Sequence, residues 1–167
     1  MKYAIVFSSQ TGNTQMLAEK IRAALPAENC LYFGKPDAAA LAADRIYAGF
    51  WTNQGTCDAK AADFLKSISK GEVYLFGTAG FGGMQSYFDK ILQRTAENLC
   101  SDVSLIGSFM CQGKMPMSVR RRYEKMQNSG DSRIPNVQGL IDNFDRALTH
   151  PDPEDLDALA KSVRELP

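Results

Sequence analysis

The sequence has little of what metal centres, disulfide scaffolds and nucleic-acid binding surfaces require. It contains one histidine, His150, and four cysteines without any Cys-x-x-Cys pair, so no zinc-binding set is recognisable. Basic and acidic residues number 19 each, and this balance argues against a cationic surface for nucleic acid. The one dense cluster, Arg120–Arg122, is typical of a solvated helix face. We therefore expect no metal and no nucleic-acid partner.

Long hydrophobic segments are also missing. The apolar run near the N-terminus, Tyr3–Phe7, ends too early for a signal peptide. No other run approaches the ~18 apolar residues that a membrane-spanning helix needs. The scattered cysteines are typical of reduced thiols rather than of disulfides. We expect a cytoplasmic protein without membrane insertion.

Several phosphate-chemistry signatures are absent as well. Neither the GxxxxGK[ST] pattern nor a GxGxxG pattern after the first strand occurs. A receiver domain would need acidic residues where Ser8 and Ser9 stand and where Phe50 and Trp51 stand. A phosphatase loop of the form Cys-x5-Arg starting at Cys111 would need an arginine where Met117 stands. These classes are therefore disfavoured.

What is present is an alternation of short apolar segments and helical patterns. With 167 residues, the chain suits one compact domain, residues 1–167, with a helical C-terminal extension from about residue 115. The predicted strands are Tyr3–Phe7, Cys30–Phe33, Arg45–Phe50, Glu72–Gly77 and Val103–Phe109. The predicted helices are Thr14–Leu25, Asp58–Ile68, Met84–Leu99, Met117–Gln127, Val137–Leu148 and Pro153–Glu165, with a loop at 128–135 and a helical turn or two within Gly34–Asp44.

Strands that alternate with helices predict an α/β protein with helices on both faces of a parallel sheet. Five strands fit a three-layer, doubly wound sheet with the strand order 2-1-3-4-5. In such a sheet, ligands bind outside the carboxyl ends of the strands, where the strand order reverses. The loops that follow strands one, three and four are therefore the candidate site.

The first of these loops, Ser8–Thr14, concentrates hydroxyls, amides and a glycine before a helix. A helix N-terminus carries free N–H groups and about half a positive charge, so it can bind a phosphate without lysine or arginine. An ordinary capped turn would need one such side chain rather than a continuous run. The loop thus favours phosphate binding.

The other two loops suit a flat ligand. The only tryptophan, Trp51, follows a buried strand and could stack on a planar ring, although it could also be a core aromatic. The segment Gly77–Gly83 carries four glycines, which allow the backbone to approach a ligand closely or simply form a flexible turn. Together the three loops predict a site for a phosphorylated planar ring.

Here the sequence resembles the flavodoxin family. The phosphate-loop pattern [ST]-x-T-G-x-T is met by Ser9, Thr11, Gly12 and Thr14, and the resemblance covers residues 2–110 and the last helix. It implies a flavodoxin-like fold, non-covalently bound FMN and the role of an electron carrier between a reductase and a redox partner, with no catalytic side chain. The cofactor-binding residues that it implies are Ser8, Ser9, Gln10, Thr11, Gly12, Asn13, Thr14, Phe50, Trp51, Thr52, Asn53, Gly55, Thr78, Ala79, Gly80, Phe81 and Gly82.

Two departures from the family pattern leave an alternative open. Flavodoxins are usually acidic around the flavin, whereas the charge here is balanced. The helices after Met117 exceed a minimal flavodoxin, and the segment Met110–Pro116 would bring Cys111 or Lys114 to the mouth of the site. The alternative is an NAD(P)H-dependent flavin or quinone reductase of the same fold, in which Lys114, Arg120 and Arg121 bind a second substrate.

Overall fold

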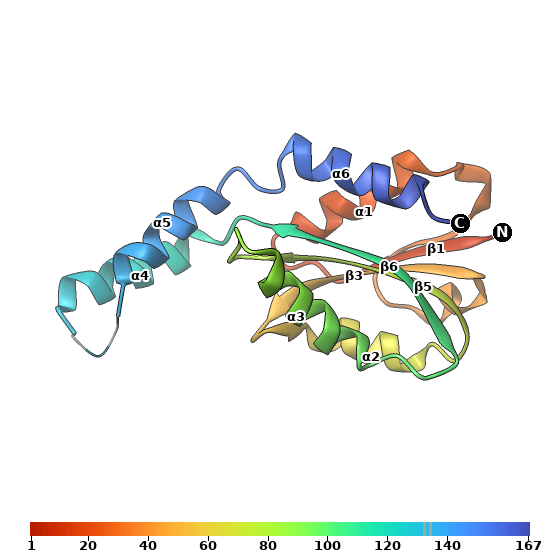
Figure 1. The fold of residues 1–167 in the computed structure, drawn as a ribbon, viewed down its shortest axis with the longest axis horizontal. Helices are drawn as coiled ribbons and strands as arrows, with labels where there is room; N and C mark the ends of the chain where they lie inside the picture. The colour runs from red at the N-terminus through yellow and green to blue at the C-terminus, as the bar shows by residue number, and fades with distance from the viewer. Residues whose placement is uncertain (132, 134) are drawn as a thin grey trace.

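The computed structural model describes residues 1–131, 133 and 135–167, and it shows a parallel sheet between two layers of helices (Figure 1). Ser132 and Ile134, in the predicted loop, lie outside the described residues. The strands are β1 (Tyr3–Phe7), β2 (Cys30–Gly34), β3 (Arg45–Asn53), β4 (Thr56–Cys57), β5 (Gly71–Ala79) and β6 (Val103–Gln112). The helices are α1 (Asn13–Ala24), α2 (Ala59–Ser67), α3 (Gln85–Ala96), α4 (Met117–Ser129), α5 (Val137–Ala147) and α6 (Pro153–Arg164), with 3-10 turns at Ala27–Asn29 and Ala38–Ala42.

The strand order is β2-β1-β3-β5-β6, and all of these strands run parallel. Because β4 is an extra short strand, this is the order 2-1-3-4-5 of the predicted strands, and the predicted fold class is confirmed. The switch point lies between β1 and β3, since the chain moves to β2 on one side of β1 and to β3 on the other.

Three strands extend further than predicted at their carboxyl ends. Trp51–Asn53, Thr78–Ala79 and Met110–Gln112 were expected in loops but belong to β3, β5 and β6. The reason is mutual pairing: Trp51 pairs with Thr78, and Thr78 pairs with Cys111, so the neighbouring strands extend one another. The candidate site is therefore built partly on the strand ends themselves, which are more rigid than loops.

The predicted loop after β3 is a small antiparallel hairpin. Thr52 pairs with Cys57 and Asn53 with Thr56, which makes β4 the returning strand. The two residues between them, Gln54 and Gly55, have φ angles of 51° and 82°. Positive φ at both central residues is the geometry that matches the twist of a two-residue hairpin.

Each face of the sheet carries its own hydrophobic core. On one face, α1 and α6 pack side by side, and Leu17, Ile21 and Leu159 are fully buried. On the other face, α2 and α3 bury Leu65 and Ile91 against the strands. Helix α2 begins where predicted, because the Asp58 carboxylate accepts hydrogen bonds from the Lys60 and Ala61 N–H groups.

Helices α4 and α5 form an arm that projects beyond the carboxyl ends of the strands (Figure 1). The arm has a small core of its own, in which Tyr123, Ile141 and Phe144 are buried. It is tied together by Arg120, whose guanidinium binds both carboxylate oxygens of Asp145 at 2.9 and 3.1 Å. No helix within the described residues is long and apolar enough to cross a membrane.

We expect the cysteines to differ sharply in reactivity. Cys57 and Cys111 are buried, and burial raises the pKa of both thiols, whereas Cys100 is exposed. A thiol reagent such as DTNB should modify Cys100 in the native protein and should reach Cys57 and Cys111 only after unfolding in urea. Cys100→Ser should remove the fast phase. Rapid native modification of Cys111 would contradict the packing of β6.

Candidate functional site

The three predicted loops converge on one cavity of about 590 Å³ at the carboxyl ends of β1, β3 and β5. Among the predicted site residues, those that line it are Gln10, Thr11, Asn13, Trp51, Thr52, Gly55, Thr78, Ala79, Gly80 and Phe81. Its volume lies in the range of small-molecule and cofactor sites, and its walls are mostly neutral or aromatic. The arrangement brings a helix N-terminus, an indole ring and a glycine-rich segment to one place.

The N-terminus of α1 lies at one end of the cavity, where the sequence predicts phosphate binding. Gly12 precedes α1 with a φ of 91°, and α1 has no side-chain cap and no acidic residue in its first turn. The Ser9 hydroxyl oxygen accepts hydrogen bonds from the Gly12 and Gln15 N–H groups at 3.2 and 3.4 Å. The N–H groups of Thr11, Asn13 and Thr14 have no acceptor among the described residues. These donors, with the helix dipole, leave the end of α1 suited to an anion.

Thr14, which belongs to the predicted motif, is fully buried and does not line the cavity. Its hydroxyl donates to the Phe50 carbonyl at 3.1 Å and lies 3.1 Å from the Thr78 hydroxyl. Because a hydroxyl has one proton, Thr78 must be the donor in the second contact. Thr14 therefore links α1 to the ends of β3 and β5 and holds the walls of the cavity in place.

Ser8, Ser9, Gly12, Phe50, Asn53 and Gly82 also lie outside the cavity lining, although Ser9 and Gly12 adjoin the lining residues Gln10, Thr11 and Asn13. Ser8 is buried, and its N–H donates to the Gly49 carbonyl at 3.0 Å. The Phe50 ring is in the core beneath α2, so it cannot stack on a ligand in the cavity. Asn53 is exposed at the hairpin, and Gly82 faces a second cavity.

The part of the cavity where the sequence predicts a planar ring is formed by Trp51 and the β5–α3 segment, residues 80–84. The Trp51 N–H is 3.4 Å from the Asp58 carboxylate, and its carbonyl accepts the Asp58 N–H at 3.1 Å, which fixes its backbone. The Trp51 side chain is half-buried and lines the cavity, as do residues of the β5–α3 segment such as Phe81. Tyr87 contributes from α3, and burial raises the pKa of its phenol, so it stays protonated at neutral pH.

The Gly80 carbonyl is the fixed point of the glycine-rich segment. It accepts the Gln112 side-chain amide at 2.9 Å and the Asn143 amide at 3.0 Å, and these two side chains are themselves hydrogen-bonded at 3.0 Å. A side chain at Gly80 would meet the Met115 sulfur at 2.5 Å, so the Met115 side chain packs directly against this glycine and would have to move for any larger residue. Strand β6 and the arm together thus position the segment.

The β6–α4 connection, 113–116, forms a wall that the predicted residue set did not include. Its Gly113 N–H donates to the Ala79 carbonyl at 2.9 Å, and the Lys114 carbonyl accepts the Asn13 side-chain amide at 2.8 Å. The Asn13 Oδ1 atom is buried and has no partner in the described part of the chain. An unpaired buried acceptor is costly unless something donates to it, so this atom suits a ligand hydroxyl or N–H.

Several residues line the cavity although they were not among the predicted site residues. Most of them belong to the arm or to the β6–α4 connection. They are Gln54, Tyr87, Gly113, Lys114, Met115, Pro116, Val119 and Arg122. Lys114 was expected near the mouth and is found there, whereas Cys111, Arg120 and Arg121 do not line this cavity. Lys114 and Arg122 are its only charged lining residues within the described part of the chain.

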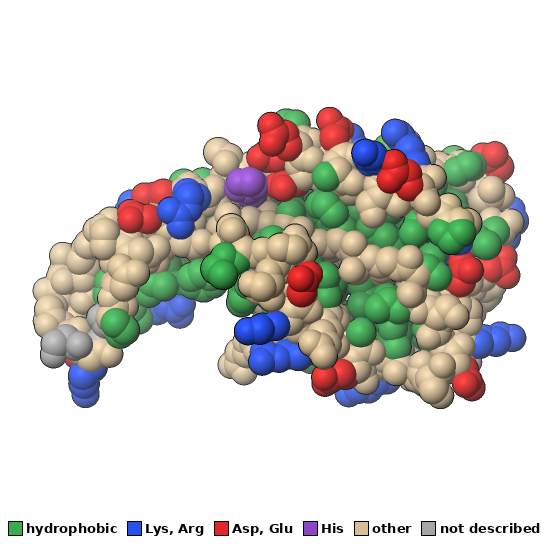
Figure 2. All heavy atoms as spheres, in the orientation of Figure 1, with side chains coloured by type: hydrophobic (Ala, Val, Ile, Leu, Met, Phe, Trp, Pro, Cys, Tyr) green, Lys and Arg blue, Asp and Glu red, His purple; other side chains and the backbone are tan. Residues whose placement is uncertain are grey.

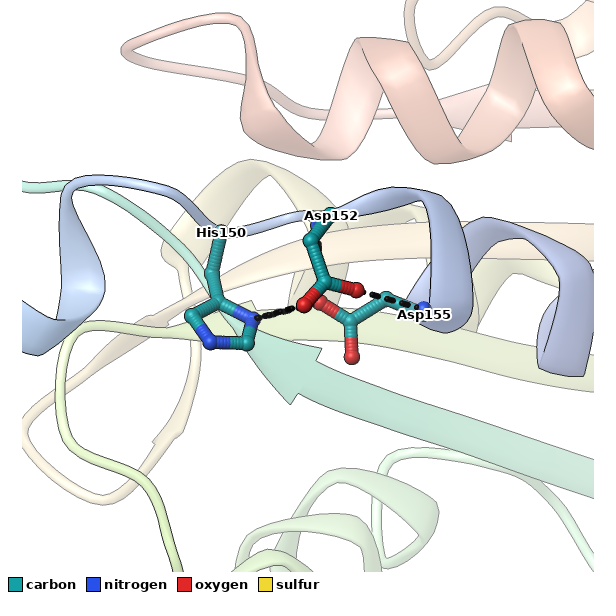
Figure 3. Close-up of side chains that lie close together, drawn as sticks. All are labelled: His150, Asp152 and Asp155. Atoms are coloured by element: carbon teal, nitrogen blue, oxygen red, sulfur yellow. Dashed lines mark hydrogen bonds and ion pairs between the residues drawn. The ribbon is translucent and has the colours of Figure 1, made fainter.

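A second cavity, of about 690 Å³, lies on the other side of the Gly80–Gly83 segment, and His150 and Asp155 are among its lining residues. Figure 3 shows His150 pointing toward Asp152 and Asp155 at the start of α6. The His150 Nδ1 atom lies 2.6 Å from the Asp155 carboxylate. Both aspartates also accept backbone N–H groups in a capping box, so local helix capping accounts for the cluster.

Comparison with known proteins agrees with this architecture. The chain is 44% identical to the flavodoxin-like domain-containing protein BilS of Clostridium symbiosum (strain WAL-14163), over 95% of this chain and 92% of that protein. The structure resembles oxidised flavodoxin 2 from Bacillus cereus with a TM-score of 0.56, at 16% identity over 98% of this chain and 96% of that one.

A flavoprotein in complex with FMN from Lactobacillus acidophilus NCFM also matches, with a TM-score of 0.50 and 18% identity over 65% of this chain and 92% of that one. At such identities these solved structures support the fold alone. Residues 4–164 match the flavodoxin domain, which is nearly the whole chain. The chain therefore belongs to the flavodoxin domain family, whose members bind flavin.

Proposed function

We propose that this protein binds FMN in the 590 Å³ cavity and carries electrons between a reductase and a redox partner in the cytoplasm. The observation that supports this most strongly is the convergence of the uncapped end of α1, Trp51 and the β5–α3 segment on one cavity. When bound, FMN supplies the capacity to accept and donate one or two electrons. The chain supplies binding, orientation and electrostatics.

Each end of the cavity has a separate task in this proposal. The backbone N–H groups of Thr11 and Asn13 and the hydroxyls of Ser9 and Thr11 would bind the phosphate. Asn13 lines the cavity, and its buried, unpaired Oδ1 atom is an acceptor at the edge of this end. The buried Thr14 side chain acts through the walls that it joins rather than by direct contact.

The ring would lie between Trp51 and the β5–α3 segment, where the exposed residue Phe81 can contact its edge. Tyr87, protonated at neutral pH, can donate a hydrogen bond without carrying charge. No side chain in this arrangement would be needed as an acid or base, because electron transfer is the chemistry that the bound flavin would supply.

The first test is flavin uptake by the full chain. We expect the purified protein to be yellow, or to become yellow when FMN is added, and acid to release FMN rather than FAD. A colourless protein that takes up no FMN would refute the proposal.

The second test separates a carrier from an enzyme. NADPH alone should reduce the bound FMN slowly in stopped-flow measurements, and a flavodoxin reductase should accelerate the reduction strongly. Rapid reduction by NADPH without any added reductase would overturn the carrier function while leaving FMN binding intact.

A further inference from the structure

The mouth of the candidate flavin cavity is cationic. Lys114 and Arg122 line it, and within the described residues no aspartate or glutamate does. A third cation, Arg94 of α3, donates to the Gly55 carbonyl at 3.3 Å, at the tip of the β3–β4 hairpin that borders the cavity. None of these three side chains forms an ion pair with a carboxylate among the described residues, although all three are exposed.

What sets these three cations apart is their position around one cavity, because ion pairs hold only some of the other cations among the described residues. Arg120 is bound to Asp145 and Glu124, Arg45 to Glu72, and Lys20 to Asp157. With 19 residues of each sign, the chain as a whole is neutral, so the positive field at the cavity is a local feature. Charges of one sign gathered at a concave surface attract partners of the opposite sign and accelerate their association.

The space-filling view shows the shape of this region. A hollow lies beneath the arm, between the arm and the body of the protein, and Lys and Arg side chains lie on both sides of it (Figure 2). Apolar side chains run along the underside of the arm (Figure 2). Met115 and Val119 bring apolar surface from the arm to the cavity itself. An apolar centre with a charged rim is the usual anatomy of a protein–protein interface.

We propose that this hollow is the docking site for an acidic protein, which presents carboxylates to Lys114, Arg122 and Arg94. The inference rests on the proposed function, because it names the chemistry of the redox partner that would reach the flavin. A protein is favoured over a small anion because the three cations come from three separate elements and flank an apolar surface. Complementary charge would then set the association rate and exclude basic partners.

The test uses Trp51, the only tryptophan, as a reporter inside the cavity. In the flavin-free full chain at low ionic strength, iodide should quench the Trp51 fluorescence more strongly than caesium does. The ratio of iodide quenching to caesium quenching should be several-fold higher for the protein than for N-acetyltryptophanamide. Added salt should abolish this preference, because the Debye length falls from about 30 Å at 0.01 M to about 3 Å at 1 M. Poly-L-glutamate should protect Trp51 from iodide, whereas poly-L-lysine should not.

Two matched double variants test whether Lys114 and Arg122 are the source of the positive charge at the cavity. The double variant Lys114→Gln/Arg122→Gln should lose the iodide preference and the effect of poly-L-glutamate. The control, Lys66→Gln/Lys161→Gln, changes the net charge equally at exposed sites on α2 and α6 and should behave like the parent. Circular dichroism and the melting temperature would confirm that both variants are folded.

Three outcomes would overturn the inference. Equal quenching by iodide and caesium would exclude a positive cavity, and equal effects of the two double variants would exclude these residues as its source. Iodide preference without protection by poly-L-glutamate would assign the cations to a small anion instead of a protein. All of these readouts are independent of flavin, so a failure here is distinguishable from a failure to bind FMN.

Discussion

Gly12→Val should weaken FMN binding by about 10- to 100-fold and leave riboflavin binding nearly unchanged, because hydrogen bonds to a charged group contribute about 1.5–3 kcal/mol each. Gly12 has a φ of 91°, a conformation that β-branched residues rarely adopt. The space around a new side chain is open, so the effect comes from the backbone. A valine would force the loop to turn its N–H groups away from the phosphate, which riboflavin lacks.

The chain provides a close control for this backbone strain. Gly130, at the end of α4, has a φ of 62°, and a side chain there would also meet no atom within 4 Å among the described residues. Gly130→Val should lower the melting temperature through the same strain and leave the affinities for both ligands unchanged. Titration of the two variants with FMN and riboflavin, by flavin fluorescence, decides the matter. Equal losses for both ligands in Gly12→Val would mean that the loop does not bind phosphate.

Much of the fold could be predicted because its signals are local. The apolar segments, the Asp58 cap and the helical patterns place every large element within a few residues of its observed bounds. The carboxyl ends of β3, β5 and β6 could not be predicted in the same way, because each continues as long as its neighbour pairs with it. Pairing of this kind depends on residues distant in the sequence, and no periodicity within one segment reports it.

The burial of Thr14 could have been predicted from its helical spacing, although its place in the motif indicated phosphate binding. Its spacing to Leu17, Ala18 and Ile21 is three, four and seven residues, which is one face of a helix, and all four residues are fully buried. The motif suggested a phosphate contact for its hydroxyl, whereas the periodicity places that hydroxyl against the sheet. A threonine on the buried face of a helix needs hydrogen-bond partners, and the Phe50 carbonyl and Thr78 provide them.

The arm and the connection before it supply cavity-lining residues whose position could not be predicted from the sequence. Lys114, Met115, Val119 and Arg122 reach the cavity only because β6 ends beside β5 and the arm then turns over the strand ends. The Gln112 and Asn143 amides that hold the Gly80 carbonyl are separated from it by 32 and 63 residues. Contacts of this length are a property of the assembled fold.

Asn143→Leu should weaken FMN and riboflavin by the same factor, in contrast to Gly12→Val. Asn143 is 6% exposed, donates to the Gly80 carbonyl and accepts from Gln112. Leucine has a similar size but no polar atoms, so the carbonyl and the Gln112 amide each lose a partner. Loss of buried hydrogen-bond partners should lower the free energy of unfolding by about 1–3 kcal/mol. The β5–α3 segment would lose one of its two anchors and with it a fixed wall for the ring.

The matched control is Gln138→Leu, which removes an exposed amide from the same helix. Urea unfolding and titration with both flavins should show little change in this control, because its partners, Gln127 and Asp142, are exposed and can bind water instead. If Asn143→Leu lowered stability but left both affinities intact, the contact would anchor the arm without shaping the cavity. If it weakened FMN alone, the effect would have reached the phosphate end. Equal loss for the two ligands is the result that places the influence of the arm at the ring, because the two flavins share the ring and differ only in the phosphate.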